Sequence, residues 1–151
     1  MRNKRILLGM LALLLSACSE NQTETLTPNQ STDKRWYTIE QVSAGAELFQ
    51  ANCAACHGKQ AEGSANWQKP GADGKYPAPP LNGTGHGWHH PLAILYQLIK
   101  YGSPGGQGNM PAWGEKLSDD EIIAAIAWFQ SHWSREIYQN WANRDAASRK
   151  Q

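Results

Sequence analysis

Two cysteines and a histidine stand within five residues of the chain, Cys53, Cys56 and His57, in the sequence ANCAACHG. Thiolates and imidazoles are common ligands of transition metals, and paired thiols also carry out disulfide chemistry. Four kinds of site are therefore chemically possible: a disulfide redox site, half of a zinc site, a metal site with distant ligands, or a covalently attached haem. The rest of the sequence distinguishes between them.

The N-terminal segment has the pattern of a signal peptide. Basic residues at positions 2, 4 and 5 precede an apolar run from Ile6 to Leu15, which is too short to span a membrane. The run ends in LSAC, which resembles the bacterial lipoprotein cleavage box, where cleavage precedes a cysteine that receives acyl chains. We expect residues 1–17 to be a lipoprotein signal peptide and Cys18 to carry the lipid, with an ordinary secretory signal as the alternative. The expected location is the bacterial cell envelope, with the chain anchored in the lipid bilayer and facing the periplasm or the cell exterior.

The charge of the remaining chain excludes one class of partner. Residues 1–17 hold three of the 14 basic side chains and none of the 13 acidic ones, so their removal leaves a net charge of −2. A nucleic-acid-binding protein needs a concentration of basic residues. We therefore expect no nucleic-acid partner.

The number of cysteines narrows the choice of site. With Cys18 lipidated, only Cys53 and Cys56 remain, too few for a four-cysteine zinc site or a second disulfide. A zinc site that recruits His57 and another histidine stays open, as does a thioredoxin-like redox pair, although that pair belongs to a βαβ pattern that this chain lacks. Cys-x-x-Cys-His is typical of c-type haem attachment, in which two thiols add to the vinyl groups of the porphyrin and the histidine binds iron.

The pattern of the chain predicts an all-α domain with three or more helices. Capping-box pairs mark the starts of two helices, after Thr38 and Ser118, and a third is expected between Pro91 and Gly102. The long Gly- and Pro-rich segments between helices need a large buried cofactor to organise them. The expected divisions are the signal peptide, a lipidated cysteine and flexible tether, a globular domain, and a polar C-terminal tail, at residues 1–17, 18–35, 36–133 and 134–151.

An iron atom bound by one imidazole needs a ligand on its other side. Met110 is the one methionine outside the expected signal peptide, and it lies in a Gly-rich loop before the helix that follows Ser118. Methionine paired with histidine is a known haem ligation. His86, His89 and His90 are the competing candidates, whereas His132 is expected on the surface.

The residues from 38 to 133 resemble a small soluble-type bacterial cytochrome c domain with one haem. The matching stretches are AGAELFQANCAACHG, APPLNGTG and NMPAWGEKLSDDEIIAAIAWFQ, in the order of that family. The resemblance implies a cytochrome c fold wrapped around one haem c. It also implies a crossing of two helices, with Gly45 and Phe49 opposite Ala125 and Trp128.

The resemblance assigns roles to six residues. It implies covalent attachment of the haem through Cys53 and Cys56, with His57 and Met110 as the axial iron ligands. It further implies that the carbonyl of Pro79 accepts the N–H of the axial histidine, and it matches Leu81 to a residue that packs against the haem.

These observations predict a single-electron carrier, not an enzyme, that exchanges electrons with redox proteins of the membrane or periplasm. Two alternatives remain. One is a haem enzyme or gas sensor with an open or histidine-ligated sixth position, and the other is a subunit of a larger dehydrogenase or oxidase complex.

Overall fold

Residues 34–150 are described by the structure, which is a computed structural model. Within this range the chain forms five α-helices, two short 3₁₀ helices and no named strand, which confirms the expected all-α class. The α-helices are α1 (Ile39–Asn52), α2 (Ala54–His57), α3 (Leu92–Tyr101), α4 (Asp119–Ser131) and α5 (Arg135–Ser148). The 3₁₀ helices are η1 (Gly87–His89) and η2 (Pro104–Gly106). No described helix is long and apolar enough to cross a membrane. The expected signal peptide, Cys18 and the tether up to residue 33 lie outside the described residues.

Helices α1 and α4 both begin at the capping boxes that the sequence predicted. Thr38 Oγ1 accepts the N–H of Gln41 at 3.2 Å, and the Gln41 side chain accepts the N–H of Thr38 at 3.0 Å. Ser118 and Glu121 make the same reciprocal pair before α4. These bonds satisfy N–H groups that the first turn of a helix leaves without a partner.

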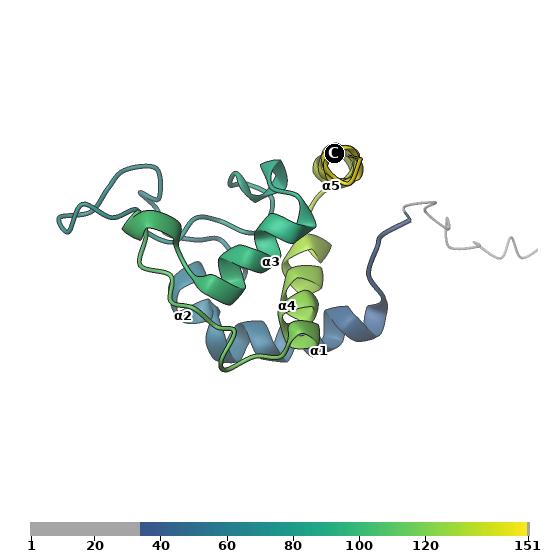
Figure 1. Cartoon of the computed structure of the whole chain (residues 1–151), viewed down its shortest axis with the longest axis horizontal. Coiled ribbons are helices and arrows are strands. Elements are labelled where there is room, and N and C mark those ends of the chain that lie inside the picture. The colour runs from purple at the N-terminus through teal and green to yellow at the C-terminus, as the bar shows by residue number, and fades with distance from the viewer. Residues whose placement is uncertain (1–33, 151) are drawn as a thin grey trace, which may run out of the picture. The chain divides into compact units, whose positions relative to one another are not determined.

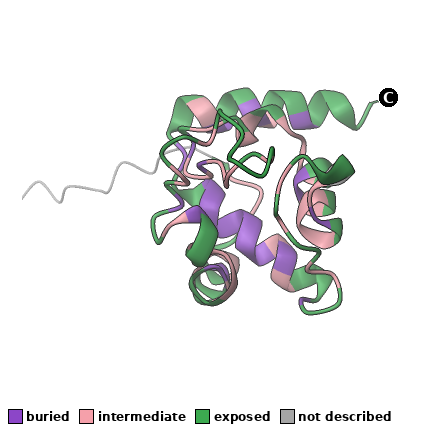
Figure 2. Ribbon diagram, turned by 90° about the vertical axis from the view of Figure 1, so that its left-hand side faces the viewer, coloured by how far each residue is buried: buried purple, intermediate pink, exposed green. Residues whose placement is uncertain are grey.

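Helix α4 supplies half of the buried hydrophobic residues in the described part of the chain. Residues 122 and 124 to 130 are all buried, and Figure 2 shows this helix in purple along most of its length. A helix that is buried on nearly every side has to be covered by several other elements. It is the element around which the rest of the domain packs.

Helix α1 crosses α4 at very short range (Figure 1). A Cβ atom on Gly45 would lie 2.6 Å from the carbonyl carbon of Ala124, closer still to its oxygen, and 2.9 Å from Trp128 Cβ. One turn on, the rings of Phe49 and Trp128 are 4.3 Å apart. The expected crossing is therefore present, although the closest backbone contact of Gly45 falls on Ala124 and not on Ala125.

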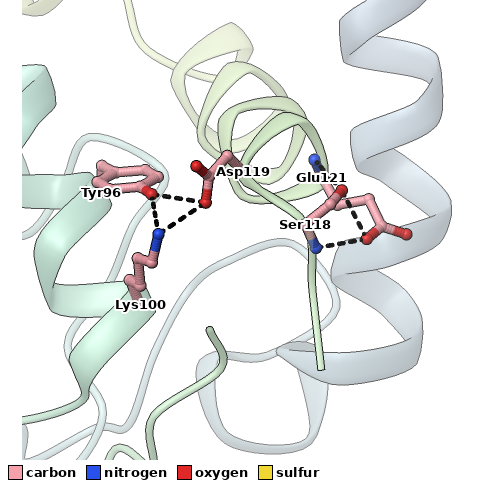
Figure 3. A network of polar contacts seen from close by, with 5 residues as sticks. All are labelled: Tyr96, Lys100, Ser118, Asp119 and Glu121. Carbon is pink, nitrogen blue, oxygen red and sulfur yellow. Dashed lines mark hydrogen bonds and ion pairs between the residues drawn. The ribbon is translucent and has the colours of Figure 1, made fainter. Parts of the chain in front are cut away.

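Helix α3 is tied to the start of α4 by a polar network (Figure 3). Lys100 Nζ donates to the Asp119 carboxylate at 2.9 Å and to the Tyr96 hydroxyl at 2.7 Å, and Tyr96 donates to the same carboxylate at 2.6 Å. Hydrogen bonds from Tyr96 and then Lys100 lower the pKa of Asp119. Pro91 caps the start of α3 and Gly102, with φ of +80°, ends it, close to the positions expected.

The residues that follow Trp133, which the sequence analysis interpreted as a polar tail over 134–151, form helix α5, and three of its side chains are buried. In α5, Tyr138, Trp141 and Asp145 are buried. Trp141 Nε1 donates to the carbonyl of His90 at 2.9 Å, and Asp145 accepts the N–H of Leu92 at 2.8 Å. Helix α5 therefore caps α3 and holds the segment that precedes it.

The first described residues close the domain against its C-terminal half. The N–H of Trp36 donates to the hydroxyl of Tyr138 at 2.8 Å, and its indole N–H donates to the side-chain oxygen of Gln130 at 2.6 Å. The guanidinium of Arg35 lies 4.0 Å from the centre of the Tyr138 ring. The two ends of the described chain are thus joined to each other directly.

Candidate functional site

The two thiols and the histidine share one helical turn at the junction of α1 and α2. Cys53 ends α1 by donating its N–H to Phe49, and its carbonyl accepts the N–H groups of Cys56 at 3.1 Å and His57 at 2.9 Å. Both cysteines are free thiols, Cys53 half-buried and Cys56 exposed. Burial, and then the neighbouring Cys56, raises the pKa of Cys53 to about 11. The candidate ligand atoms on this turn are therefore the half-buried thiol of Cys53, the exposed thiol of Cys56 and the imidazole of His57.

His57 is buried, and one of its ring nitrogens is already engaged. Only 7% of its surface is exposed, and Nδ1 lies 2.9 Å from the carbonyl oxygen of Pro79. Because a carbonyl can only accept, Nδ1 carries the proton and Nε2 keeps the lone pair that a metal can bind. Burial lowers the pKa of His57 despite the bond to Pro79, so the ring is neutral near pH 7. This hydrogen bond is the one that the family resemblance implied for Pro79.

A glycine allows the chain to bring Pro79 back to the histidine. Gly63, with φ of +69°, donates its N–H to the carbonyl of His57 at 2.7 Å. A Cβ at this position would lie 2.5 Å from the carbonyl carbon of Pro79 and 2.8 Å from Pro80 Cα. No side chain fits in this contact, so the position requires glycine for both its conformation and its space.

Leu81 follows on the same segment and lies partly buried against the core. Its N–H donates to the carbonyl of Ala61 at 2.8 Å, and its carbonyl accepts the indole N–H of Trp133 at 2.7 Å. The backbone of this segment is thus fixed on both sides. Its side chain is half-buried.

Met110 lies in the loop after α3 and is half-buried. The N–H of Ser103 donates to the Met110 carbonyl at 3.0 Å, and the N–H of Met110 donates to the Ser103 hydroxyl at 3.3 Å. Three residues later, Trp113 donates its N–H to the carbonyl of Ile99 at 3.1 Å. The loop is therefore attached to the end of α3 at the methionine itself and again three residues later.

An apolar hollow of about 390 Å³ is lined by residues of the segment that contacts His57 and by His86. Pro79, bonded to His57, lines one part of it, and Tyr76 lines another. Tyr76 forms an isolated parallel bridge with Gly108, two residues before Met110. The remaining lining residues are Trp67, Gln68, Pro77 and His86.

Of the three candidate histidines, His86 lines the hollow. His86 stacks on Trp67 with ring centres 5.2 Å apart, His90 approaches His86 edge-on at 5.5 Å, and His89 lies against Trp88 at 3.7 Å. Burial, followed by the neighbouring histidines, lowers the pKa values of His86 and His90. In the described part of the chain, no three histidine, cysteine or acidic side chains come together as a metal site. His132 is exposed, as expected.

The chain is similar to known proteins over the residues that form this site. The protein-family model described as cytochrome C oxidase, cbb3-type, subunit III matches residues 40–129, which include both cysteines, the histidine and Met110. The chain belongs to this family of cytochromes c. It is an electron carrier by family, and the family implies a covalently bound haem c.

Relatives and a solved structure support this membership. Cytochrome c-551 of Bacillus subtilis is 32% identical over 117 residues, which cover 78% of this cytochrome and 82% of the relative. Cytochrome c6 of a Picosynechococcus species is 36% identical over 89 residues, which cover 58% of this cytochrome and 69% of the relative. The crystal structure of cytochrome CL from Methylophaga aminisulfidivorans has a TM-score of 0.52 and 25% identity, over 89% of this cytochrome and 85% of that chain.

The described residues of this cytochrome fit a c-type haem. Cys53 and Cys56 are free thiols on one helical turn, and His57 keeps one nitrogen available while its partner Pro79 lines an apolar hollow. Two contacts here were not predicted from the sequence: the stacking of Trp67 on His86, and the bond between Asp73 and Asn109, which precedes Met110. No local pattern marks either contact, because the residues are far apart in the chain.

Proposed function

We propose that this protein carries one electron at a time through a single haem c with histidine and methionine as axial ligands. The observation that supports the proposal is that one apolar hollow is lined both by Pro79, which is bonded to His57, and by Tyr76, which is bridged to Gly108 two residues before Met110. When bound, the haem supplies the ferrous and ferric states between which an electron is stored. The protein provides its ligands, excludes water and limits access to the iron.

Each residue of the proposed site has a distinct task. The thiols of Cys53 and Cys56 would each add to one vinyl group of the haem, so that each S–H bond and one C=C π bond are replaced by a C–S and a C–H bond with no leaving group. His57 binds iron through Nε2, and Pro79 fixes the ring by accepting the Nδ1 proton. Met110 supplies the sulfur, which favours the ferrous state and raises the reduction potential.

The replacement Met110→Ala tests this ligation. The native ferric protein should show the weak near-infrared band of sulfur bound to iron, and the variant should lose it. The reduction potential should fall, and the ferrous variant should bind carbon monoxide, which the native protein excludes. The covalent haem should persist, because both thiols are unchanged.

The matched control is His86→Ala, because His86 also lines the hollow. This variant should keep the near-infrared band. If the native protein lacks the band and His86→Ala opens the iron to carbon monoxide, histidine is the sixth ligand and the proposal is wrong. His89→Ala and His90→Ala should be tested in the same way, for the near-infrared band and for carbon monoxide binding.

We also propose that acylated Cys18 anchors the protein in the lipid bilayer of a bacterial envelope, where it exchanges electrons with redox proteins of the membrane or periplasm. The supporting pattern is LSAC after a short apolar run. Cys18→Ser should leave the haem spectrum unchanged and release the processed protein from the membrane fraction. A variant that stays membrane-bound with a processed, unacylated N-terminus would contradict the anchor.

A further inference from the structure

An exposed polar turn lies beside the loop of the proposed sixth ligand. Gly71 donates its N–H to the carbonyl of Lys75 at 2.8 Å, and Gly74 donates to Gly71 at 3.0 Å. The residues from 68 to 74 are all exposed. A turn with so little buried surface gains little stability from its own packing. Its contacts with neighbouring segments therefore determine what it contributes.

Two hydrogen bonds join this turn to the residues just before Met110. The N–H of Tyr76 donates to the carbonyl of Gln107 at 2.8 Å, next to the Tyr76–Gly108 bridge. Asn109 Nδ2 donates to Asp73 Oδ2 at 2.9 Å. The turn therefore holds three consecutive residues of the loop.

Asp73 is well placed to make a strong version of this contact. Its other oxygen, Oδ1, accepts the N–H of Lys75 at 3.0 Å, which fixes the orientation of the carboxylate. The bond from Asn109 is the main cause that lowers the pKa of Asp73, so the group is charged near neutral pH. A hydrogen bond to a charged acceptor is stronger than one between neutral groups.

The opposite side of the loop is held independently. Ser103 makes two hydrogen bonds with the backbone of Met110, and a Cβ on Gly102 would lie 2.7 Å from the Met110 carbonyl oxygen. The end of α3 therefore fixes Met110 itself. The turn around Asp73 fixes the residues that lead into it.

We propose that Asp73 is a positioning residue for Met110, which it restrains through Asn109 so that the loop stays closed over the haem site. This inference rests on the proposed role of Met110 as the sixth ligand. Asp73 touches neither the iron nor the methionine, and its effect is on the fraction of molecules in which the loop is open. A competing ligand binds only the open form, so its apparent affinity rises in proportion to that fraction.

Titration of the ferric holoprotein with imidazole tests the inference. Imidazole nitrogen replaces the methionine sulfur while the iron remains ferric, and the near-infrared band disappears in proportion. Asp73→Ala and Asn109→Ala should each raise the imidazole affinity roughly two- to fivefold, the range expected for one exposed hydrogen bond to a carboxylate. The double variant should show no larger rise than Asp73→Ala alone, because without Asp73 the Asn109 side chain has no contact left to lose. Asp73→Asn, which keeps an acceptor oxygen but not the charge, should have a smaller effect.

Asp120→Ala is the matched control, since it removes an exposed carboxylate from α4 and changes the net charge equally. It should leave the imidazole affinity unchanged. An equal rise in this control would show a general effect of charge on the iron and would overturn the inference. So would unchanged affinity in Asp73→Ala, or effects of the two single changes that add in the double variant, and in both cases the native band would keep Met110 as ligand. Absence of the band from the native protein would overturn both the proposed function and this inference.

Discussion

The crossing of α1 and α4 makes Gly45→Ala a sensitive test of the fold. The added Cβ would lie 2.6 Å from the carbonyl carbon of Ala124 and 2.9 Å from Trp128 Cβ. Carbon atoms that are not bonded prefer separations of about 3.5–4.0 Å, so the overlap is about 1 Å. The atoms that obstruct the methyl group are the carbonyl group of Ala124, in the backbone of α4, and the Cβ atom of the buried Trp128. They cannot move aside without moving the helix.

Two opposing effects set the size of the change. Separating the helices by about 1 Å forfeits a quarter to a half of the dispersion energy across the contact, including that of the Phe49–Trp128 ring pair. Overpacking of this kind destabilises by about 1–3 kcal/mol, and the backbone overlap places this site near the upper limit. Alanine is favoured over glycine within a helix by about 1 kcal/mol. The net loss in free energy of unfolding is therefore about 2 kcal/mol.

Urea denaturation of the holoprotein, followed by far-ultraviolet circular dichroism, measures this difference in the free energy of unfolding. In thermal unfolding, the melting temperature should fall by roughly 10 °C. Ala44→Gly, on the exposed face of the same helix, is the control. It should lose about 1 kcal/mol from helix propensity alone. A Gly45→Ala protein that is as stable as the native one, or more stable, would show that the two backbones do not approach closely and would refute the crossing.

Three further outcomes are expected. Asp145→Ala should lower the free energy of unfolding by about 1–2 kcal/mol, because the N–H of Leu92 at the start of α3 loses its acceptor; an unchanged urea midpoint would contradict this cap. In haem-free protein at pH 8, iodoacetamide should modify exposed Cys56 before Cys53, whose pKa burial raises to about 11, and peptide mass spectrometry should find unequal rates. Burial lowers the pKa of His90 in the folded protein, so as the pH falls His90 is protonated in the unfolded chain before it is protonated in the folded one. The free energy of unfolding should therefore fall between about pH 7 and about pH 5. Urea midpoints measured over this range should depend less on pH in His90→Gln.

Features that depend on neighbours in the sequence were predictable. The capping boxes at Thr38 and Ser118 join residues three apart, and both appear in the structure. The spacing of Cys53, Cys56 and His57 likewise determines that one helical turn carries all three. Local spacing is sufficient in these cases because the interacting groups lie within one or two turns.

Features that depend on distant partners were not predictable from pattern. Trp141 and Asp145 follow a helical spacing within a polar sequence, but their partners lie 51 and 53 residues earlier. The sequence around Trp141 does not indicate that its indole N–H donates to the carbonyl of His90. The bond between Asp73 and Asn109 spans 36 residues, and that between His57 and Pro79, 22 residues apart, was expected only from family resemblance.

The contact between Trp36 and Tyr138 also has a consequence for biosynthesis. The two residues are 102 positions apart, so the domain cannot close until nearly all of it has been synthesised. At about 5–20 residues per second, that takes roughly 5–20 s after Trp36 is made. The segment with Cys53 and Cys56 is complete early in this interval, while the core around it is still open. The late closure therefore gives a modifying enzyme a period in which both thiols are accessible on an extended chain.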